Sequence, residues 1–326
     1  MNKKTLLSGV KPTGRPHIGN YFGAMKQFVD MQNDYNAIYM IVDYHALNFI
    51  QNKEDMSRNI LDLALDYLAL GLDPQKSIIF KQSDVSEHAE LAWIFDTITT
   101  MPYLMRAHAY KDAEAKNKEI SVGAFNYPML MAADILLYDT DIVPVGQDQK
   151  QHVEYARDTA QKFNFTFRAD TFKLPDVQIL EEVAVVPGTD GRKMSKSYGN
   201  TIPLFATTEE ITKAVMSIAT DSKGINESRN PEEDNVFKLH KLFSNPGELA
   251  ELQEKYEKGG IGHKESKEIL IKNIDAFIAP LRDKRAKLAD DTDYVLDVLR
   301  DGGKRAKLKA EKKMGAVREA IGVKLY

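Results

Sequence analysis

The chain contains no cysteine, a single tryptophan and no long apolar run. The absence of cysteine excludes disulfides, thiolate nucleophiles and zinc–thiolate sites, and it agrees with a reducing compartment. Apolar stretches such as 38–42 are far shorter than the roughly 18 residues that a membrane-spanning helix needs. The N-terminal residues 3–9 lack the apolar region of a signal peptide. We therefore expect a cytoplasmic protein that does not cross a membrane.

What the chain does contain is typical of a globular protein. Of its 326 residues, 43% are hydrophobic and 28% are charged, and the 19 glycines and 12 prolines are scattered. This composition excludes disordered and collagen-like classes. The length exceeds that of most single cores, so we expect two domains.

Charge is distributed unevenly along the chain. The net charge is −4, yet residues 300–326 hold nine Lys or Arg against three acids. A basic helix on an acidic body could hold a nucleic-acid phosphate backbone at one defined place. The simpler alternative is a solvated helix face.

Strand-like and helix-like patterns alternate over the first 200 residues, which predicts a Rossmann-like α/β fold: a parallel sheet with helices on both faces. The expected strands are Thr5–Val10, Ala37–Val42, Ser77–Phe80, Asp141–Val145 and Val183–Val186.

After Pro203 the strand-like runs end and helical periodicity continues, as in Ile269–Ile278 and Tyr294–Leu299. The polar segment 220–235 reads as a long loop. We therefore predict a Rossmann-like α/β domain over 1–203 and an all-helical C-terminal domain over 204–326.

The segment KPTGRPHIGN follows the first strand and opens a helix. Glycines 14 and 19 leave the backbone accessible, and unpaired N–H groups at a helix start attract phosphate. His17 and Asn20, three residues apart, lie on the same side. An ordinary turn in which His17 is only a helix cap is the alternative.

A second glycine-rich segment, PGTDGRKMSKSYGN, begins at Pro187 and carries three cations, Arg192, Lys193 and Lys196. Such a loop could bring ammonium groups to a polyphosphate and then open to release product. A flexible basic surface loop is the alternative.

A third segment places an acid among apolar residues. If residues 127–138 are helical, Tyr127, Met131, Asp134 and Tyr138 share one face. A buried carboxylate needs donors. The donor is either an Arg, Lys or backbone amide of the protein, or it arrives with a ligand such as a flat aromatic molecule bearing an N–H.

Two of these segments resemble the signatures of class I aminoacyl-tRNA synthetases: HIGN at 17–20 is similar to HIGH, and KMSKS at 193–197 is identical to the second motif. The segment YPMLMAADILLYDTDIVPVGQDQKQH at 127–152 resembles the tryptophanyl-tRNA synthetase family. The resemblance extends to NYFGAMKQFV, VDYHAL, LAWIF and IATDSKG, and is strongest before residue 225.

The resemblance implies a tryptophan pocket in which Asp134 accepts a hydrogen bond from the indole N–H, while Tyr127 and Gln149 hold the α-ammonium group. The remaining expected pocket residues are Met131, Val143, Val145 and His45.

The resemblance also implies an ATP site in which Gly146 and Asp148 meet the ribose and Met194 lies near the adenine. The catalytic groups would be His17, Asn20, Lys193 and Lys196. The full set expected at ATP is Lys11, Pro12, Thr13, Gly19, Asn20, Gly146, Gln147, Asp148, Lys193, Met194, Ser195, Lys196 and Ser197.

The activity implied is activation of L-tryptophan by ATP, followed by transfer to tRNA(Trp). The resemblance makes 1–203 the catalytic domain and 204–326 a helical domain that binds the tRNA anticodon. Mg²⁺ is expected from the chemistry of ATP, although no metal-ligand cluster is evident, and the family implies a homodimer. A tyrosyl-tRNA synthetase, a small-molecule adenylating enzyme and a paralogue without catalysis are the rivals.

Three places bear on these expectations. Lys11 stands where many family members carry Gln, and residues 99–111 depart from the common family pattern. The roles of Arg106 and Lys111 therefore stay open. Trp93 is expected in the core, with a dimer-interface position as the alternative.

Overall fold

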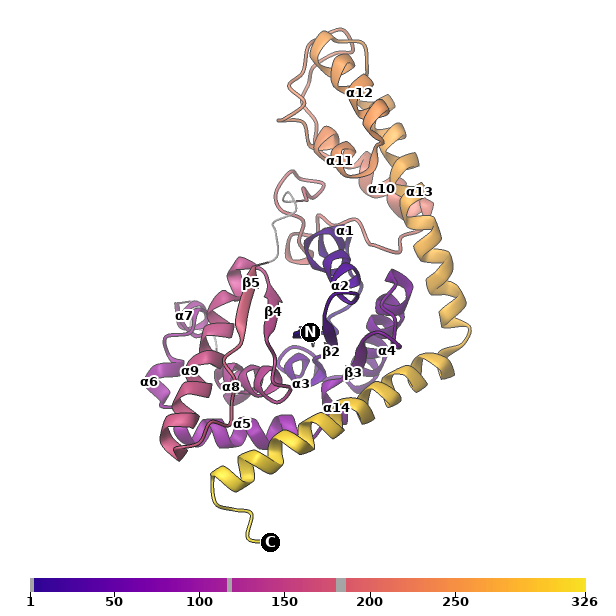
Figure 1. Ribbon diagram of the computed structural model, residues 1–326. Helices are drawn as coiled ribbons and strands as arrows, with labels where there is room; N and C mark the ends of the chain where they lie inside the picture. The colour runs from indigo at the N-terminus through magenta and orange to yellow at the C-terminus, as the bar shows by residue number, and fades with distance from the viewer. Residues whose placement is uncertain (1–2, 116–118, 180–185) are drawn as a thin grey trace. The chain divides into compact units, whose positions relative to one another are not determined.

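The computed structural model describes residues 3–115, 119–179 and 186–326. It divides into two compact units: Met1–Gly14, Phe28–Leu180 and Asp291–Tyr326 form unit 1, and Arg15–Gln27 with Glu181–Asp290 forms unit 2. Figure 1 shows the helices and strands of both.

Unit 1 is built on a parallel sheet with strand order β3-β2-β1-β4-β5. Its strands are β1 (Thr5–Val10), β2 (Asn36–Ile41), β3 (Ile78–Lys81), β4 (Ile142–Val145) and β5 (Asp176–Ile179). The first four confirm the expected strands to within one residue. β2 is almost wholly buried, which fits a strand with neighbours on both sides and helices on both faces.

The fifth described strand, β5, was not among the expected strands. The observed edge strand β5 was missed because it has only four residues, two of them polar, and follows Pro175. Of the expected Val183–Val186, residues 183–185 lie outside the described part of the chain.

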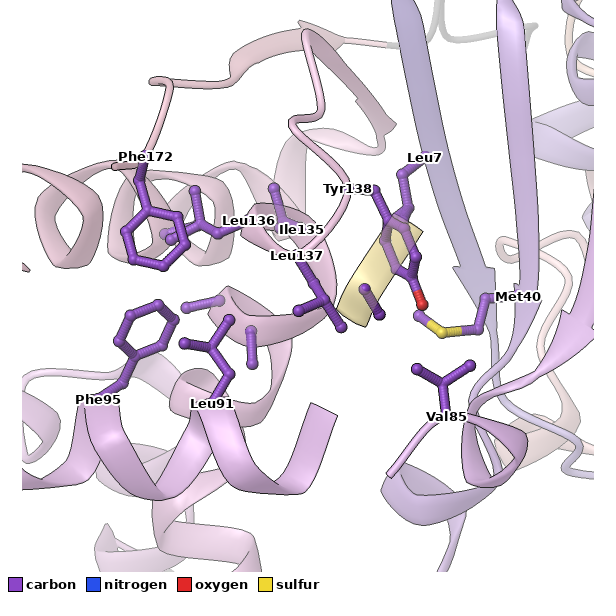
Figure 2. Packing of buried hydrophobic residues seen from close by; sticks show 14 of the residues in the cluster. Leu7, Met40, Val85, Leu91, Phe95, Ile135, Leu136, Leu137, Tyr138 and Phe172 are labelled. Carbon is purple, nitrogen blue, oxygen red and sulfur yellow. The ribbon is translucent and has the colours of Figure 1, made fainter. Parts of the chain in front are cut away.

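Unit 1 also contains several helices. They are α3 (Asp43–Ala46), α4 (Lys53–Leu70), α5 (Glu87–Ile98), α6 (Met101–Leu104), α7 (His108–Ala115), α8 (Val122–Leu136), α9 (Lys150–Phe167) and α14 (Thr292–Ala320), with the short turns η2 (Gln82–Asp84) and η3 (Gln147–Gln149). Figure 2 shows Phe95 and Phe172 packed close to α8, and Tyr138 near Leu7 and Met40 of the sheet. This core fixes α8, the helix that carries Asp134.

Trp93 lies on α5 but is not part of that core. Its exposed fraction is 70%, so the expectation of a core tryptophan is wrong. It faces solvent in the single chain because α5 packs on the core through Leu91 and Phe95, both fully buried, on another side of the helix.

The C-terminal helix α14 packs closely against β3. A Cβ on Gly302 would lie 1.8 Å from the carbonyl oxygen of Ile79, so only glycine permits this approach. Arg305 donates to the carbonyl of Pro74 at 2.8 Å, and Lys313 to that of Thr171 at 2.9 Å. Two of the basic side chains of α14 therefore hold this helix against the rest of unit 1.

Unit 2 is mainly helical. It contains α1 (Ile18–Asn20), the π-helical η1 (Tyr21–Met25), the start of α2 (Lys26–Met31), the turn η4 (Lys196–Tyr198), α10 (Thr208–Met216), α11 (Asn235–Phe243), α12 (Pro246–Lys258) and α13 (His263–Ala289). Aromatic contacts join η1 to α11 and α13: the ring of Phe22 lies 5.5 Å from that of Phe243 and 5.9 Å from that of Phe277.

The expected helical segments of the C-terminal region are confirmed, since Ile269–Ile278 lies within α13 and Tyr294–Leu299 within α14. The expected long loop lies between α10 and α11. The predicted division into two functional domains at residue 203 stays a prediction. The compact units have different boundaries, because α14 packs on the sheet of unit 1 and Arg15–Gln27 belongs to unit 2 with the later helices. Among the described helices, none is long and apolar enough to cross a membrane.

Candidate active site

Asp134 lies on α8 in unit 1, and its exposed fraction is 2%. Gln82 donates to Oδ1 at 2.7 Å, and His45 Nε2 lies 2.9 Å from Oδ2. His88 Nδ1 lies 2.6 Å from Oδ1, but this contact lacks hydrogen-bond geometry and is best described as electrostatic. The protein therefore supplies donors to this acid, through imidazole and amide groups rather than the expected Arg, Lys or backbone amide.

These neighbours keep Asp134 ionised. Burial alone would raise its pKa, because a carboxylate loses hydration in the interior. The nearby imidazoles of His88 and His45 outweigh this effect and lower the pKa of Asp134 to about 2. A carboxylate has about four acceptor positions, so the three neighbours leave room for one more donor.

Gln82 and His88 were missed from the sequence. The amide of Gln82 has one orientation, because its Oε1 accepts from the backbone N–H of Tyr44 at 3.1 Å while its Nε2 faces Asp134. Its position directly after β3 was a usable signal, since ligands bind at the carboxyl ends of parallel strands. The fully buried His88 gave no such signal; its Nε2 lies 2.8 Å from the hydroxyl of Tyr138.

A second hydrogen-bonded group lies on α8, η3 and α9. The hydroxyl of Tyr127 lies 2.6 Å from His152 Nε2, and His152 Nδ1 lies 2.6 Å from Gln149 Oε1. Burial raises the pKa of Tyr127 to about 12, so the phenol is neutral. The ring of His45 lies 6.4 Å from that of Tyr127, edge to face. Two of the expected ammonium ligands are thus joined by His152, to which the sequence assigned no role.

Other residues expected at the site are arranged as follows. Val143 is buried, and Met131 and Val145 are half-buried. Gly146 is the N-cap of η3, and Gln147 is exposed within it. The side chain of Asp148 lies outside the described part of the structure.

The segment after β1 differs in exposure from residue to residue. Pro12 is buried and Thr13 is exposed. The ammonium of Lys11 lies 4.7 Å from the centre of the Phe49 ring. This cation–π contact gives Lys11 an aromatic neighbour that a family glutamine would not need.

In unit 2, His17 and Asn20 cap the first helical turn reciprocally. Asn20 N–H donates to His17 Nδ1 at 3.2 Å, and His17 N–H donates to Asn20 Oδ1 at 3.1 Å. Burial, and then the charge of Lys196, lower the pKa of His17 to about 4. The ring is therefore neutral at pH 7, and because Nδ1 accepts, Nε2 carries the proton. His17 therefore caps the helix, and its ring still has an N–H donor.

The loop after Pro187 is held by its own backbone and by Asn200. That buried side chain accepts from Ser195 N–H at 2.8 Å and donates to Asp190 at 2.7 Å and to the Lys193 carbonyl at 3.2 Å. A Cβ on Gly188 would lie 2.2 Å from the Asn200 amide. Asn200, unassigned from the sequence, thus fixes the loop.

The three cations of this loop differ. Arg192 pairs with Asp190 at 2.6 Å and lies 4.2 Å from the centre of the Tyr198 ring. Lys193 and Lys196 are exposed. Two of the three cations thus have exposed side chains, while Arg192 holds the loop together.

Met194 differs from the cations of this loop, since it is only 4% exposed and so belongs to the core. A Cβ on Gly19 would lie 3.3 Å from Met194 Cβ and 2.9 Å from His17 Nδ1. Gly19 is therefore required by neighbours within unit 2, and it brings the 17–20 and 193–197 segments into contact. Ser195 is half-buried and Ser197 exposed.

A metal site of protein ligands is not evident in the described ranges, which contain no group of three or more His, Asp or Glu side chains able to hold an ion.

The parallel sheet and the paired 17–20 and 193–197 segments are features of the class I tRNA synthetases. In agreement, the family model of the class I tRNA synthetases (W and Y) matches residues 1–279. Two curated relatives are tryptophan–tRNA ligases: that of Fusobacterium nucleatum is 48% identical, covering 98% of both chains, and that of Rhodopirellula baltica is 46% identical, covering 98% of this chain and 99% of the other.

A solved structure agrees with them. The tryptophanyl-tRNA synthetase of Campylobacter jejuni, complexed with ADP and tryptophan, superposes with a TM-score of 0.93 at 46% identity, covering 98% of this chain and 99% of the other. The chain belongs to the tryptophan–tRNA ligase family.

Proposed function

We propose that this protein activates L-tryptophan with ATP, forming tryptophanyl-adenylate and pyrophosphate, and then transfers the tryptophyl group to the 3′ end of tRNA(Trp). In the first step the substrate carboxylate attacks the α-phosphorus in line, so no protein nucleophile is needed. Catalysis then consists of positioning and charge stabilisation. The observation that carries the proposal is the buried, ionised Asp134 with an acceptor position to spare.

Tryptophan is assigned to the group around Asp134. Oδ2 faces His45 alone among the described contacts, and it accepts the indole N–H as a second donor. Met131, Val143 and Val145 contact the apolar ring. Tyr127 and Gln149 accept from the α-ammonium group. A phenol both donates and accepts a hydrogen bond, whereas the ionised Asp134 only accepts, so the pocket suits an indole N–H better than the hydroxyl of tyrosine.

ATP is assigned to the two segments of unit 2 and to the residues after β1 and β4. The Nε2–H of His17 and the side chain of Asn20 donate to phosphate oxygens, and Lys193 and Lys196 stabilise the charge that moves to pyrophosphate. The proposed contacts to the nucleoside and the remaining phosphate oxygens come from Lys11, Pro12, Thr13, Gly19, Gly146, Gln147, Asp148, Met194, Ser195 and Ser197.

Mg²⁺ accompanies ATP in this proposal as a companion of the triphosphate. The described residues do not offer a carboxylate cluster for it. The ion would therefore be held mainly by phosphate oxygens and water, as is common for Mg²⁺.

The proposed macromolecular partners are tRNA and a second copy of the chain. The helical region from residue 204, together with exposed lysines of α14, is proposed to bind the tRNA. The exposed Trp93 supports a homodimer, since large exposed aromatic side chains are enriched at protein interfaces. A cytoplasmic location follows from tRNA as the substrate.

The test is tryptophan-dependent exchange of labelled pyrophosphate into ATP, followed by charging of purified tRNA with labelled tryptophan. Asp134→Asn keeps the shape but removes the ionised acceptor. We expect it to weaken tryptophan binding about tenfold or more and to lower the selectivity for tryptophan over tyrosine and phenylalanine. Asp170→Asn, at an exposed position of unit 1, is the matched control. An unchanged selectivity ratio in Asp134→Asn would refute the pocket assignment.

A further inference from the structure

We propose that His152 is a positioning residue that fixes the hydrogen-bond polarity of Tyr127 and Gln149, so that both present oxygen lone pairs to a cationic amine. The inference rests on the proposed function for the identity of that amine, the α-ammonium group of tryptophan. It adds a residue that neither substrate contact nor sequence pattern singled out.

The geometry places His152 between the two oxygens. Residues 149 and 152 are three apart at the start of α9, so their side chains lie on the same face. The imidazole reaches Gln149 Oε1 through Nδ1 and the hydroxyl of Tyr127 through Nε2, at 2.6 Å each. Its ring meets that of Tyr127 edge to face, with 5.3 Å between ring centres. One imidazole therefore bridges α8 and the turn before α9.

The positions of the protons follow from these contacts. An amide oxygen only accepts, so Nδ1 of His152 carries the proton of that bond. Burial raises the pKa of Tyr127 to about 12, so its hydroxyl retains a proton, and we assign that proton to the hydrogen bond with Nε2 of His152. The chain of donation runs from Tyr127 through His152 to Gln149.

This polarity has a consequence for the ligand. Tyr127 has a single O–H proton, and His152 uses it, so the phenol oxygen meets any other partner as an acceptor. The carbonyl oxygen of Gln149 is an acceptor as well, since it accepts from His152. Two acceptors of fixed direction suit a group that only donates and carries positive charge, which is the chemistry of an ammonium.

A purely structural bridge would behave differently. If the chain only joined α8 to α9, its loss would weaken every ligand of the pocket to the same degree, because the pocket as a whole would loosen. If it sets polarity, its loss affects only ligands that carry the amine.

The experiment compares two ligands by calorimetry on the full-length protein. L-tryptophan carries the amine, and indole-3-propionate has the same ring and carboxylate without it. We expect His152→Ala to weaken tryptophan about tenfold or more, the scale of a charge-assisted hydrogen bond, and to change indole-3-propionate by less than about twofold. His152→Gln keeps one donor and one acceptor and should restore tryptophan binding to within about threefold.

The outcomes separate the two proposals. Equal weakening of both ligands in His152→Ala, or unchanged tryptophan binding, would overturn the role of His152. Failure of the wild-type protein to bind tryptophan would instead overturn the proposed function. The KM for ATP, measured in the same variants, is expected to stay unchanged and shows that the protein remains folded.

Discussion

The charged group around Asp134 in unit 1 is buried, whereas the lysines of the 193–197 loop in unit 2 are exposed. Asp134 is buried and surrounded by three side chains, whereas Lys193 and Lys196 are exposed on a loop held by Asn200. A buried charge with fixed neighbours discriminates between ligands, because an imperfect ligand leaves polar groups unpaired. An exposed ammonium costs little to move and suits charge that develops during reaction. The two regions therefore divide selection from catalysis.

The sharpest way to break this division is to remove one lysine. Lys196→Ala should slow tryptophan-dependent ATP–pyrophosphate exchange by roughly 10²-fold or more, the scale of losing one transition-state contact. The dissociation constant of tryptophan should stay unchanged, since unit 1 holds that ligand. Lys162→Ala, at an exposed position of α9, is the control. Near-normal exchange would show that Lys196 takes no part in the mechanism. Weakened tryptophan binding would contradict the separation of ligand selection from catalysis.

A change of pH tests the neutral state of His17. Its folded pKa of about 4 lies below the ordinary value of 6.5, so the unfolded chain binds more protons between these values. The stability from neutral His17 is thus complete above about pH 6.5 and is lost as pH falls toward 4. We expect a loss of about 2 kcal/mol between pH 7 and pH 5, measured by urea unfolding. His17→Asn should remove this part of the pH dependence; an identical pH profile would contradict it.

The smallest expected effect concerns a third region, the exposed lysines of α14. Changing Lys304, Lys309 and Lys312 to Gln should lower tRNA affinity several-fold and reduce its salt dependence by about one unit of slope per lost phosphate contact. Exchange of pyrophosphate should be unaffected. Filter binding at two salt concentrations measures this.

Lys313→Gln is the matched control for those lysines, because Lys313 pairs with Asp139 at 2.5 Å and with the Thr171 carbonyl. It should lower stability rather than the salt slope. An unchanged slope in the triple variant would indicate that these lysines face solvent only.

Sequence patterns predicted the sheet and both phosphate-related segments because these depend on local order: strand, turn and helix follow one another directly. β5 escaped detection because it has only four residues, too few for their polar and apolar alternation to stand out. The neighbours of Asp134 escaped for a different reason. Gln82 follows another strand and His88 lies on another helix. Their spacing from Asp134 in the sequence does not indicate contact, which arises only from the tertiary fold.

The exposure of Trp93 has the same cause. A lone tryptophan amid apolar neighbours suggests a core position, yet which face of α5 is covered depends on where α8 and α9 pack. The structure covers Leu91 and Phe95 and leaves Trp93 at 70% exposure. Periodicity predicts that a face is buried, and only tertiary contacts show which one.

The close approach of Gly302 to Ile79 bears on how the protein is made. β3 is an edge strand, and edge strands attract other chains unless something shields them. In this protein the edge of β3 is covered by α14, which is synthesised long after the strand. The edge of β3 in a nascent chain therefore stays exposed until α14 has emerged from the ribosome. A side chain larger than glycine at position 302 would hinder the packing of α14 on β3 and so prolong the time for which this edge is exposed. We expect such a variant to aggregate during expression.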